Sequence, residues 1–88
     1  MEDFTREELL AEPEIRMSII HQSVWAFISY ESDKTKALRQ GSRFRYQNKI
    51  YEVQLIAVNP AIPQNVVNFA CFHIERDVDN LLASEPQV

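Results

Sequence analysis

Cys71, His73 and Glu75 are the residues whose types and spacing come nearest to a chemical site. They alternate along one apolar segment, so on a β-strand their side chains share a face, about 6–7 Å apart at their bases. A thiolate beside an imidazole can act as a nucleophile, and thiol, imidazole and carboxylate together can ligate a metal. His21, which also lies among apolar residues, is a further candidate for the same cluster.

This pattern is nonspecific, because it lacks the Cys-x-x-Cys or helical histidine spacing of recognisable metal sites. A buried structural cysteine and a half-buried histidine are the favoured explanation. The sequence also contains no Gly-rich phosphate loop, nucleophile elbow or His-Glu-x-x-His motif. We therefore expect no enzymatic activity, no cofactor and no metal, and a thiol- or metal-dependent enzyme at Cys71 and His73 is the least favoured hypothesis.

Charge is segregated along the 88-residue chain, whose formal net charge is −4. Residues 1–14 and 75–88 are mainly acidic, whereas residues 34–49 contain cations and no acid. We call residues 34–49 the basic segment; its cations are Lys34, Lys36, Arg39, Arg43, Arg45 and Lys49. These six residues are the predicted partner-binding residues, suited to an acidic protein surface. Alternatively, the acidic ends fold over the basic segment and leave it an ordinary solvated surface.

Aromatic residues are interleaved with these cations. Phe44, Tyr46 and Tyr51 beside lysine and arginine match the composition of surfaces that bind single-stranded nucleic acid. In a hairpin, however, the rings share one face while Arg43 and Arg45 point to the other, so we assign the rings to the core. A nucleic-acid-binding module that uses the basic segment is therefore the second hypothesis.

Residues 43–58 predict a β-hairpin, because two runs of aromatic and β-branched residues flank the polar pair Gln47-Asn48. The asparagine tolerates the left-handed backbone of a tight turn. With this pair as the loop, Arg43 faces Glu52, and a turn shifted by one residue pairs Arg45 with Glu52 instead. Both registers are chemically reasonable.

The remaining elements are less sharply indicated. Residues 66–75 and 23–30 predict strands, and residues 14–22 fit either a helix or a strand, the latter with a bulge or turn. Short helices are expected near 6–12, 33–40 and 77–83. The expected fold class is α+β: a small antiparallel sheet of three to five strands with short helices on one side, in a single domain over residues 1–88.

The leading functional hypothesis is a small non-enzymatic protein-binding module, acting as a regulator, inhibitor or accessory subunit. It rests on the missing catalytic motifs, the segregated charge and a large apolar inventory for so small a core. A surplus of apolar side chains favours an open sheet edge or face, available to a protein partner or to a second copy in a homodimer. The single cysteine and the absence of a long apolar run predict a cytoplasmic protein without membrane contact.

Overall fold

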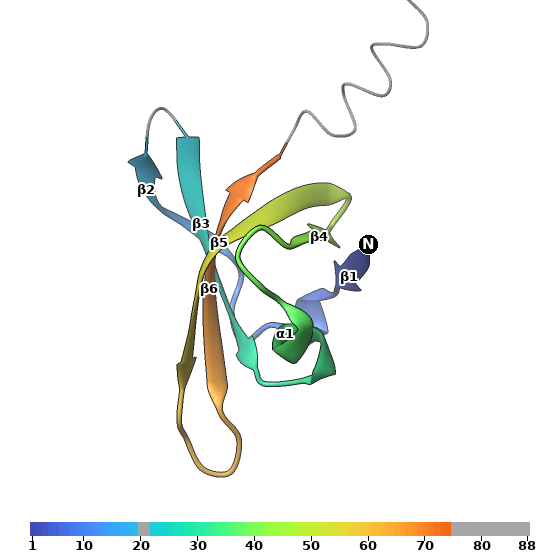
Figure 1. Ribbon diagram of the computed structural model, residues 1–88, viewed down its shortest axis with the longest axis vertical. Coiled ribbons are helices and arrows are strands. Elements are labelled where there is room, and N and C mark those ends of the chain that lie inside the picture. The colour runs from blue at the N-terminus through green and yellow to red at the C-terminus, as the bar shows by residue number, and fades with distance from the viewer. Residues whose placement is uncertain (20–21, 75–88) are drawn as a thin grey trace, which may run out of the picture.

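The computed structural model describes residues 1–19 and 22–74, and a six-stranded mixed sheet dominates them (Figure 1). The strands are β1 (Glu2–Phe4), β2 (Glu14–Ile19), β3 (Gln22–Tyr30), β4 (Arg43–Tyr46), β5 (Lys49–Asn59) and β6 (Val66–His73). Their order across the sheet is β1-β4-β5-β6-β3-β2. β1 runs parallel to β4, and every other neighbouring pair is antiparallel. Helical structure in these residues is confined to the 3₁₀ turn η1 (Arg6–Glu8) and the short α1 (Asp33–Ala37).

The prediction of an α+β fold is wrong, because the protein is mainly β, and the expected antiparallel sheet of three to five strands is a mixed sheet of six. The helix expected over 6–12 is a single 3₁₀ turn, since Leu9 and Leu10 leave it to pair with the end of β3. The helix expected over 33–40 ends at Ala37, where Leu38 adopts an extended backbone and enters the core. Local helix signals are thus overridden by strand pairing and by burial. The helix expected over 77–83 lies outside the described residues.

Strands are present where the sequence predicted them with a single interpretation. Residues 23–30 and 66–75 correspond to β3 and β6. The undecided segment 14–22 contains a strand, β2, and a bulge shifts its register within the strand. Apolar residues on both parities along 14–30 are therefore explained by a bulge and a change of strand, as the strand alternative requires.

The hairpin of β4 and β5 has the first of the two predicted registers. Arg43 pairs with Glu52, and Arg45 lies opposite Ile50 rather than Glu52. Gln47 and Asn48 form the two-residue loop with φ of 51° and 65°. Positive φ at both positions defines a type I′ turn, whose twist matches that of the flanking strands.

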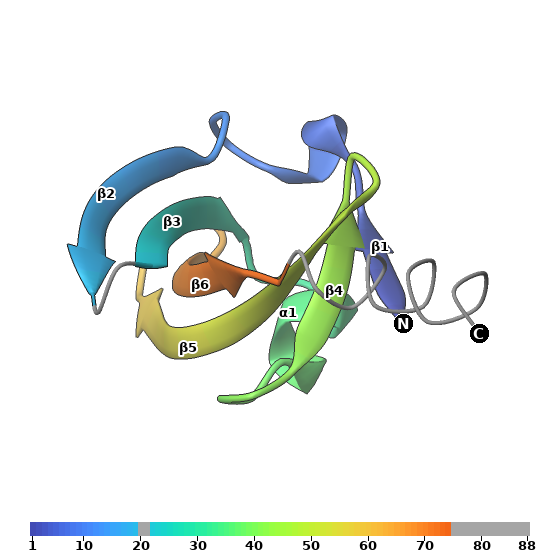
Figure 2. The ribbon, with the colours of Figure 1, turned by 90° about the horizontal axis from the view of Figure 1, so that it is seen from above.

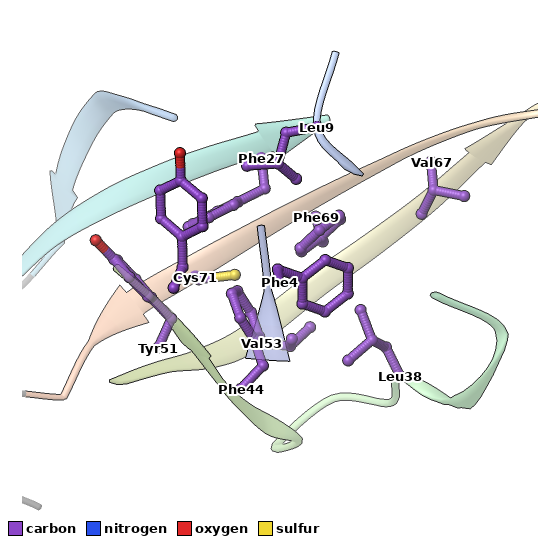
Figure 3. Close-up of a cluster of buried hydrophobic side chains, with 11 residues drawn as sticks. Phe4, Leu9, Phe27, Leu38, Phe44, Tyr51, Val53, Val67, Phe69 and Cys71 are labelled. Carbon is purple, nitrogen blue, oxygen red and sulfur yellow. The ribbon is translucent and has the colours of Figure 1, made fainter. Parts of the chain in front are cut away.

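The N-terminal segment holds both sides of the sheet together. β1 pairs with β4, and five residues after β1 the backbone of Leu9 and Leu10 bonds to β3 at Ser29 and Ile28. Figure 2 shows the resulting bend, with the sheet curling around one face. That face carries the core cluster, which consists of Phe4, Leu9, Phe27, Leu38, Phe44, Tyr46, Tyr51, Val53, Val67, Phe69 and Cys71. Phe4 points into this cluster (Figure 3), with its ring centroid 5.0 Å from that of Phe44.

Candidate functional site

Cys71 and His73 lie on the core face of β6, as their alternation predicts. Cys71 is fully buried, and burial raises the pKa of its thiol, which disfavours the nucleophilic thiolate. His73 is half-buried, and its ring centroid lies 5.3 Å from that of Tyr51. His21 and Glu75 lie outside the described residues. Within residues 1–19 and 22–74, no three histidine, cysteine or acidic side chains are grouped to hold a metal ion.

Two cations of the basic segment converge on β1. Lys34 Nζ donates to the backbone oxygen of Asp3 at 2.6 Å, and Arg45 Nε donates to its carboxylate at 2.7 Å. The hydrogen bond from Arg45 is the main cause that lowers the pKa of Asp3. Lys34 and Arg45, 11 positions apart in sequence, are therefore brought together by an acidic residue of the same chain.

Lys34 has a second internal acid. Its Nζ lies 2.8 Å from Glu8 Oε2 and 5.4 Å from the centroid of the Phe4 ring. Burial alone would raise the pKa of Glu8, but hydrogen bonds from Lys34 and from the Thr5 backbone outweigh it and lower that pKa. The acidic N-terminal residues thus fold over the start of the basic segment, which was the alternative to a binding surface.

The other four cations lie in α1, in the loop that follows it, in β4 and in β5. Arg43 forms an ion pair with Glu52 at 3.3 Å, and Arg39 donates to the backbone oxygens of Lys36 and Leu38. The side chains of Lys36 and Lys49 are exposed and contact no acid among the described residues. The role of these six cations in partner binding stays a prediction. The accompanying assignment of Phe44, Tyr46 and Tyr51 to the core is confirmed.

The opposite side of the sheet carries a second apolar surface, which we call the outer face. It is formed by alternate residues of β2, β3, β6 and β5, namely Met17, Val24, Ala26, Ile28, Leu55, Ala57, Asn68, Ala70 and Phe72. Its two most exposed large side chains are those of Leu55, at 70% exposure, and Met17, at 56%. The outer face is therefore an apolar surface that the described residues leave open.

A groove of about 400 Å³ runs across this outer face. Its floor is a pair of alanines, because Ala26 lies directly opposite Ala70 in the pairing of β3 with β6. Leu55 stands next to Ala70 on β5, while Met17 bounds the groove from β2. Two methyl groups between large side chains leave the space that forms the groove. A second hollow of about 340 Å³ continues it beside Ala57 and Asn68.

A bulge in β5 puts Leu55 on the outer face. Val53 lies opposite Cys71 and faces the core, but Leu55 lies opposite Ala70, so Gln54 is the extra residue. A regular strand would send residues 53 and 55 to the same face. The extra residue reverses this alternation and turns Leu55 outward.

A matching bulge lies in β2, on the other side of the groove. Ile15 lies opposite Trp25 and Met17 lies opposite Val24, which leaves Arg16 as the extra residue. Both bulged residues, Arg16 and Gln54, line the groove. A bulge bends its strand and increases the local twist, and these two bulges lie in the strands on either side of β3 and β6.

The charges at the rim of the outer face balance each other. Arg16 forms an ion pair with Glu14 at 3.5 Å, on the β2 side. Across the sheet, Arg43 and Glu52 form the pair described above. Two acids and two arginines leave the rim without net charge, so this surface has no electrostatic preference for a strongly charged partner.

Sequence reasoning missed the outer face as a specific site. It predicted an open edge or face without naming residues, because Ala26 and Ala70 become neighbours only through the long-range pairing of β3 and β6. The available signal was the presence of one small residue in the middle of each of two strands otherwise rich in large apolar side chains. Nothing local marks Gln54 as a bulge.

Comparison with known proteins adds no assignment. The chain matches no protein-family model, no curated protein and no solved structure. Among residues 1–19 and 22–74, no helix is long and apolar enough to cross a membrane. The functional argument therefore rests on the geometry of the described residues.

Proposed function

We propose that this chain is a non-enzymatic protein-binding module, a regulator or accessory subunit, which buries its outer face against an uncharged apolar protein surface. One observation carries the proposal: Leu55 and Met17 are exposed at the sides of an apolar groove floored by Ala26 and Ala70. Contiguous exposed apolar surface of this kind typically marks an interaction site, because its burial against a partner removes it from water.

The neutral rim supports a protein partner over nucleic acid at this surface. Nucleic-acid affinity derives chiefly from cations that neutralise phosphates. On the outer face the two arginines, Arg16 and Arg43, each lie beside a carboxylate of the same chain. An apolar protein segment needs no such cations and matches the groove.

A cytoplasmic setting is part of the proposal. Its support is the single cysteine of the chain, Cys71, which is buried in the core with a free thiol. Small domains in oxidising compartments commonly depend on disulfides, whereas this core is packed from eleven buried side chains without one.

The test compares proteins retained by immobilised wild type, Leu55→Asp and Ile62→Asp from a native lysate, with and without nuclease. Ile62 is 98% exposed in the loop between β5 and β6, so Ile62→Asp adds the same charge away from the groove. We expect a specific, nuclease-resistant set of proteins, or the chain itself, to be retained by wild type and Ile62→Asp and lost with Leu55→Asp. Equal retention by all three variants would refute binding through the outer face. Nuclease-sensitive retention would support the nucleic-acid hypothesis instead.

A further inference from the structure

We propose that the open edge of β2 binds an extended apolar segment of a partner protein, which joins the sheet as an additional strand. β1 and β2 are the two edges of the sheet, because they end the order β1-β4-β5-β6-β3-β2. An edge strand presents unpaired backbone donors and acceptors, which match the backbone of another extended segment. This inference goes beyond the proposed function, since it depends on the backbone of β2 rather than on the groove of the outer face.

The β1 edge has features that prevent such pairing. β1 contains only three residues, of which two are the acids Glu2 and Asp3. The backbone oxygen of Asp3 already accepts a hydrogen bond from Lys34 Nζ at 2.6 Å. Short edge strands and charged side chains are usual means by which proteins block strand addition, and here a lysine also occupies a backbone acceptor.

The β2 edge lacks these features. β2 is six residues long, contains neither proline nor lysine, and among the described residues its backbone pairs with β3 alone. Figure 2 shows it on the outside of the curled sheet, beyond β3. Ile15 lies opposite Trp25, on the core side, and is 55% exposed, while Met17 lies opposite Val24 on the outer face. β2 is thus an accessible edge with an exposed apolar side chain on each face.

Hydrogen bonds to β3 show which backbone groups of β2 point away from the sheet. The backbone oxygen of Ile28 accepts from the Leu10 N–H at 2.8 Å, so Ile28 bonds toward the β2 side. Because bonding direction alternates along a strand, Ala26 and Val24 bond toward β2, and the residues between them bond toward β6.

Ile15 and Ser18 therefore direct their backbone N–H and C=O groups to the open side. They lie opposite Trp25 and Ser23, which do not bond toward β2. The bulge at Arg16 does not close this edge, because Ile15 and Ser18 remain two positions apart when counted along β3. Two positions correspond to about 7 Å, the repeat of alternate residues in an extended strand. A single added strand can thus bond both residues, using two donors and two acceptors of β2.

The backbone and side chains of this edge together define the occupant. A helix bonds its backbone internally and cannot use these groups, whereas an extended segment can. Residues of the added strand beside Ile15 lie on the core side, and the residue beside Met17 lies on the outer face. We therefore expect β-branched or aromatic residues at successive positions of the bound segment.

The test selects short random peptides, displayed on phage, against the immobilised full chain. Fluorescence polarisation then measures the dissociation constants of the selected peptides for wild type and four variants. Ser18→Pro removes an outward N–H, a change tolerated at edge strands, and Ser18→Ala is its matched control. Ile15→Lys adds an edge charge and replaces Ser18→Pro if circular dichroism shows that the proline variant is unfolded. Leu55→Asp alters the groove wall on β5 instead.

We expect Ser18→Pro and Ile15→Lys to raise the dissociation constant about 10-fold or more, because each disrupts the backbone pairing. Ser18→Ala and Leu55→Asp should bind the peptides as wild type does. Amide hydrogen exchange in the complex should slow at Ile15 and Ser18, the two residues whose N–H groups become bonded.

Failure to enrich any peptide, or equal binding by wild type and both edge variants, would overturn the β2 proposal. Peptides that lose binding only with Leu55→Asp would also overturn it, while supporting the proposed function. Binding lost in the edge variants, together with lysate retention unaffected by Leu55→Asp, would support β2 and refute the proposed function. Self-association of wild type that Ser18→Pro abolishes would identify a second copy of β2 as the occupant and overturn binding of a partner segment.

Discussion

Arg45 and Asp3 occupy opposed positions in the parallel pairing of β4 with β1, and the Nε atom of the arginine lies 2.7 Å from the carboxylate. The two residues are 42 positions apart. A shift of β1 by one residue would place Asp3 beside Phe44 or Tyr46, whose side chains face the core. The ion pair and the alternation of faces therefore specify the same register. Through this register the acidic start of the chain neutralises part of the basic segment and closes the sheet.

Acidic pH should lower the free energy of unfolding, because it protonates Asp3 and breaks its ion pair with Arg45. Because the pKa of Asp3 is lowered in the folded chain, its stabilising effect is fully present above the unfolded value and is lost as pH falls through the folded pKa. Arg45→Gln should raise the pKa of Asp3 and flatten the loss of unfolding free energy between about pH 5 and pH 2. The effect on stability at neutral pH should be small, since both side chains are largely exposed and solvent screens the pair.

Carboxyl chemical shifts across a pH titration measure the pKa of Asp3 directly. Urea unfolding at each pH measures how the free energy of unfolding changes with pH. Lys49→Gln is the matched control, because Lys49 also belongs to the basic segment but contacts no acid among the described residues. An unchanged Asp3 titration in Arg45→Gln would contradict the prediction.

Local chemistry allowed part of the fold to be predicted from the sequence. The turn at Gln47-Asn48 needs only local residues and is present as expected, and Arg43–Glu52 is one of the two cross-strand pairings that the sequence left open. Thr5 and Glu8 have the spacing of a helix-starting capping box, and Glu8 does accept a hydrogen bond from the Thr5 backbone at 2.9 Å. This capping box nevertheless starts only one 3₁₀ turn, because the following residues bury more by joining β3.

The fold class and the outer face depend on distant pairings that no local pattern encodes. The parallel pairing of β1 with β4 depends on the contact of Asp3 with Arg45, which lies 42 positions further along the chain. Whether Leu55 faces inward or outward depends on one bulged residue, Gln54, and period-two alternation from Val53 places Leu55 in the core. The groove floor needs the Ala26–Ala70 register as well. Sequence patterns indicated β3, β4, β5 and β6, left the segment of β2 undecided and did not indicate β1. Only the assembled sheet shows which strand faces the described residues leave open.

Alkaline pH should destabilise the protein through Tyr46. Burial, together with a 2.8 Å hydrogen bond from its hydroxyl to Glu12, raises the pKa of Tyr46 to about 12. The protonated phenol therefore stabilises the fold fully below about pH 10, and this contribution is lost as pH rises toward about 12. Tyr46→Phe should show a shallower loss of unfolding free energy across that interval, as measured by urea unfolding at successive pH values.

Glu12→Gln is the companion variant, because it keeps an acceptor and removes the negative charge that opposes the phenolate. It should lower the pKa of Tyr46, seen as earlier appearance of tyrosinate absorbance. If Tyr46→Phe lost as much unfolding free energy at alkaline pH as wild type does, the assignment of this loss to Tyr46 would be wrong.

The thiol of Cys71 should be inert in the folded chain. Its side chain has no exposed surface, and burial raises its pKa, so both access and thiolate population are suppressed. A chromogenic disulfide reagent should titrate one thiol per chain in denaturant and react far more slowly under native conditions, at the rate of unfolding. His73→Gln should not change the native rate, because no hydrogen bond joins the histidine to Cys71. Fast native reaction that disappears in His73→Gln would instead support the thiol-enzyme hypothesis.

Phe4 should be the residue through which the N-terminal segment contributes most to stability. It belongs to the three-residue β1, yet its side chain is buried and its ring lies 5.0 Å from Phe44 and 5.7 Å from Phe69, centroid to centroid. Phe4→Ala should lower the free energy of unfolding by about 3–5 kcal/mol, the usual cost of emptying a buried phenylalanine site. Phe4→Leu should cost less, because it keeps most of the volume. Urea unfolding measures both, with Ile62→Ala as an exposed control expected to lie within about 0.5 kcal/mol of wild type. A loss below about 1 kcal/mol in Phe4→Ala would mean that β1 and its closure of the sheet contribute little to the folded state.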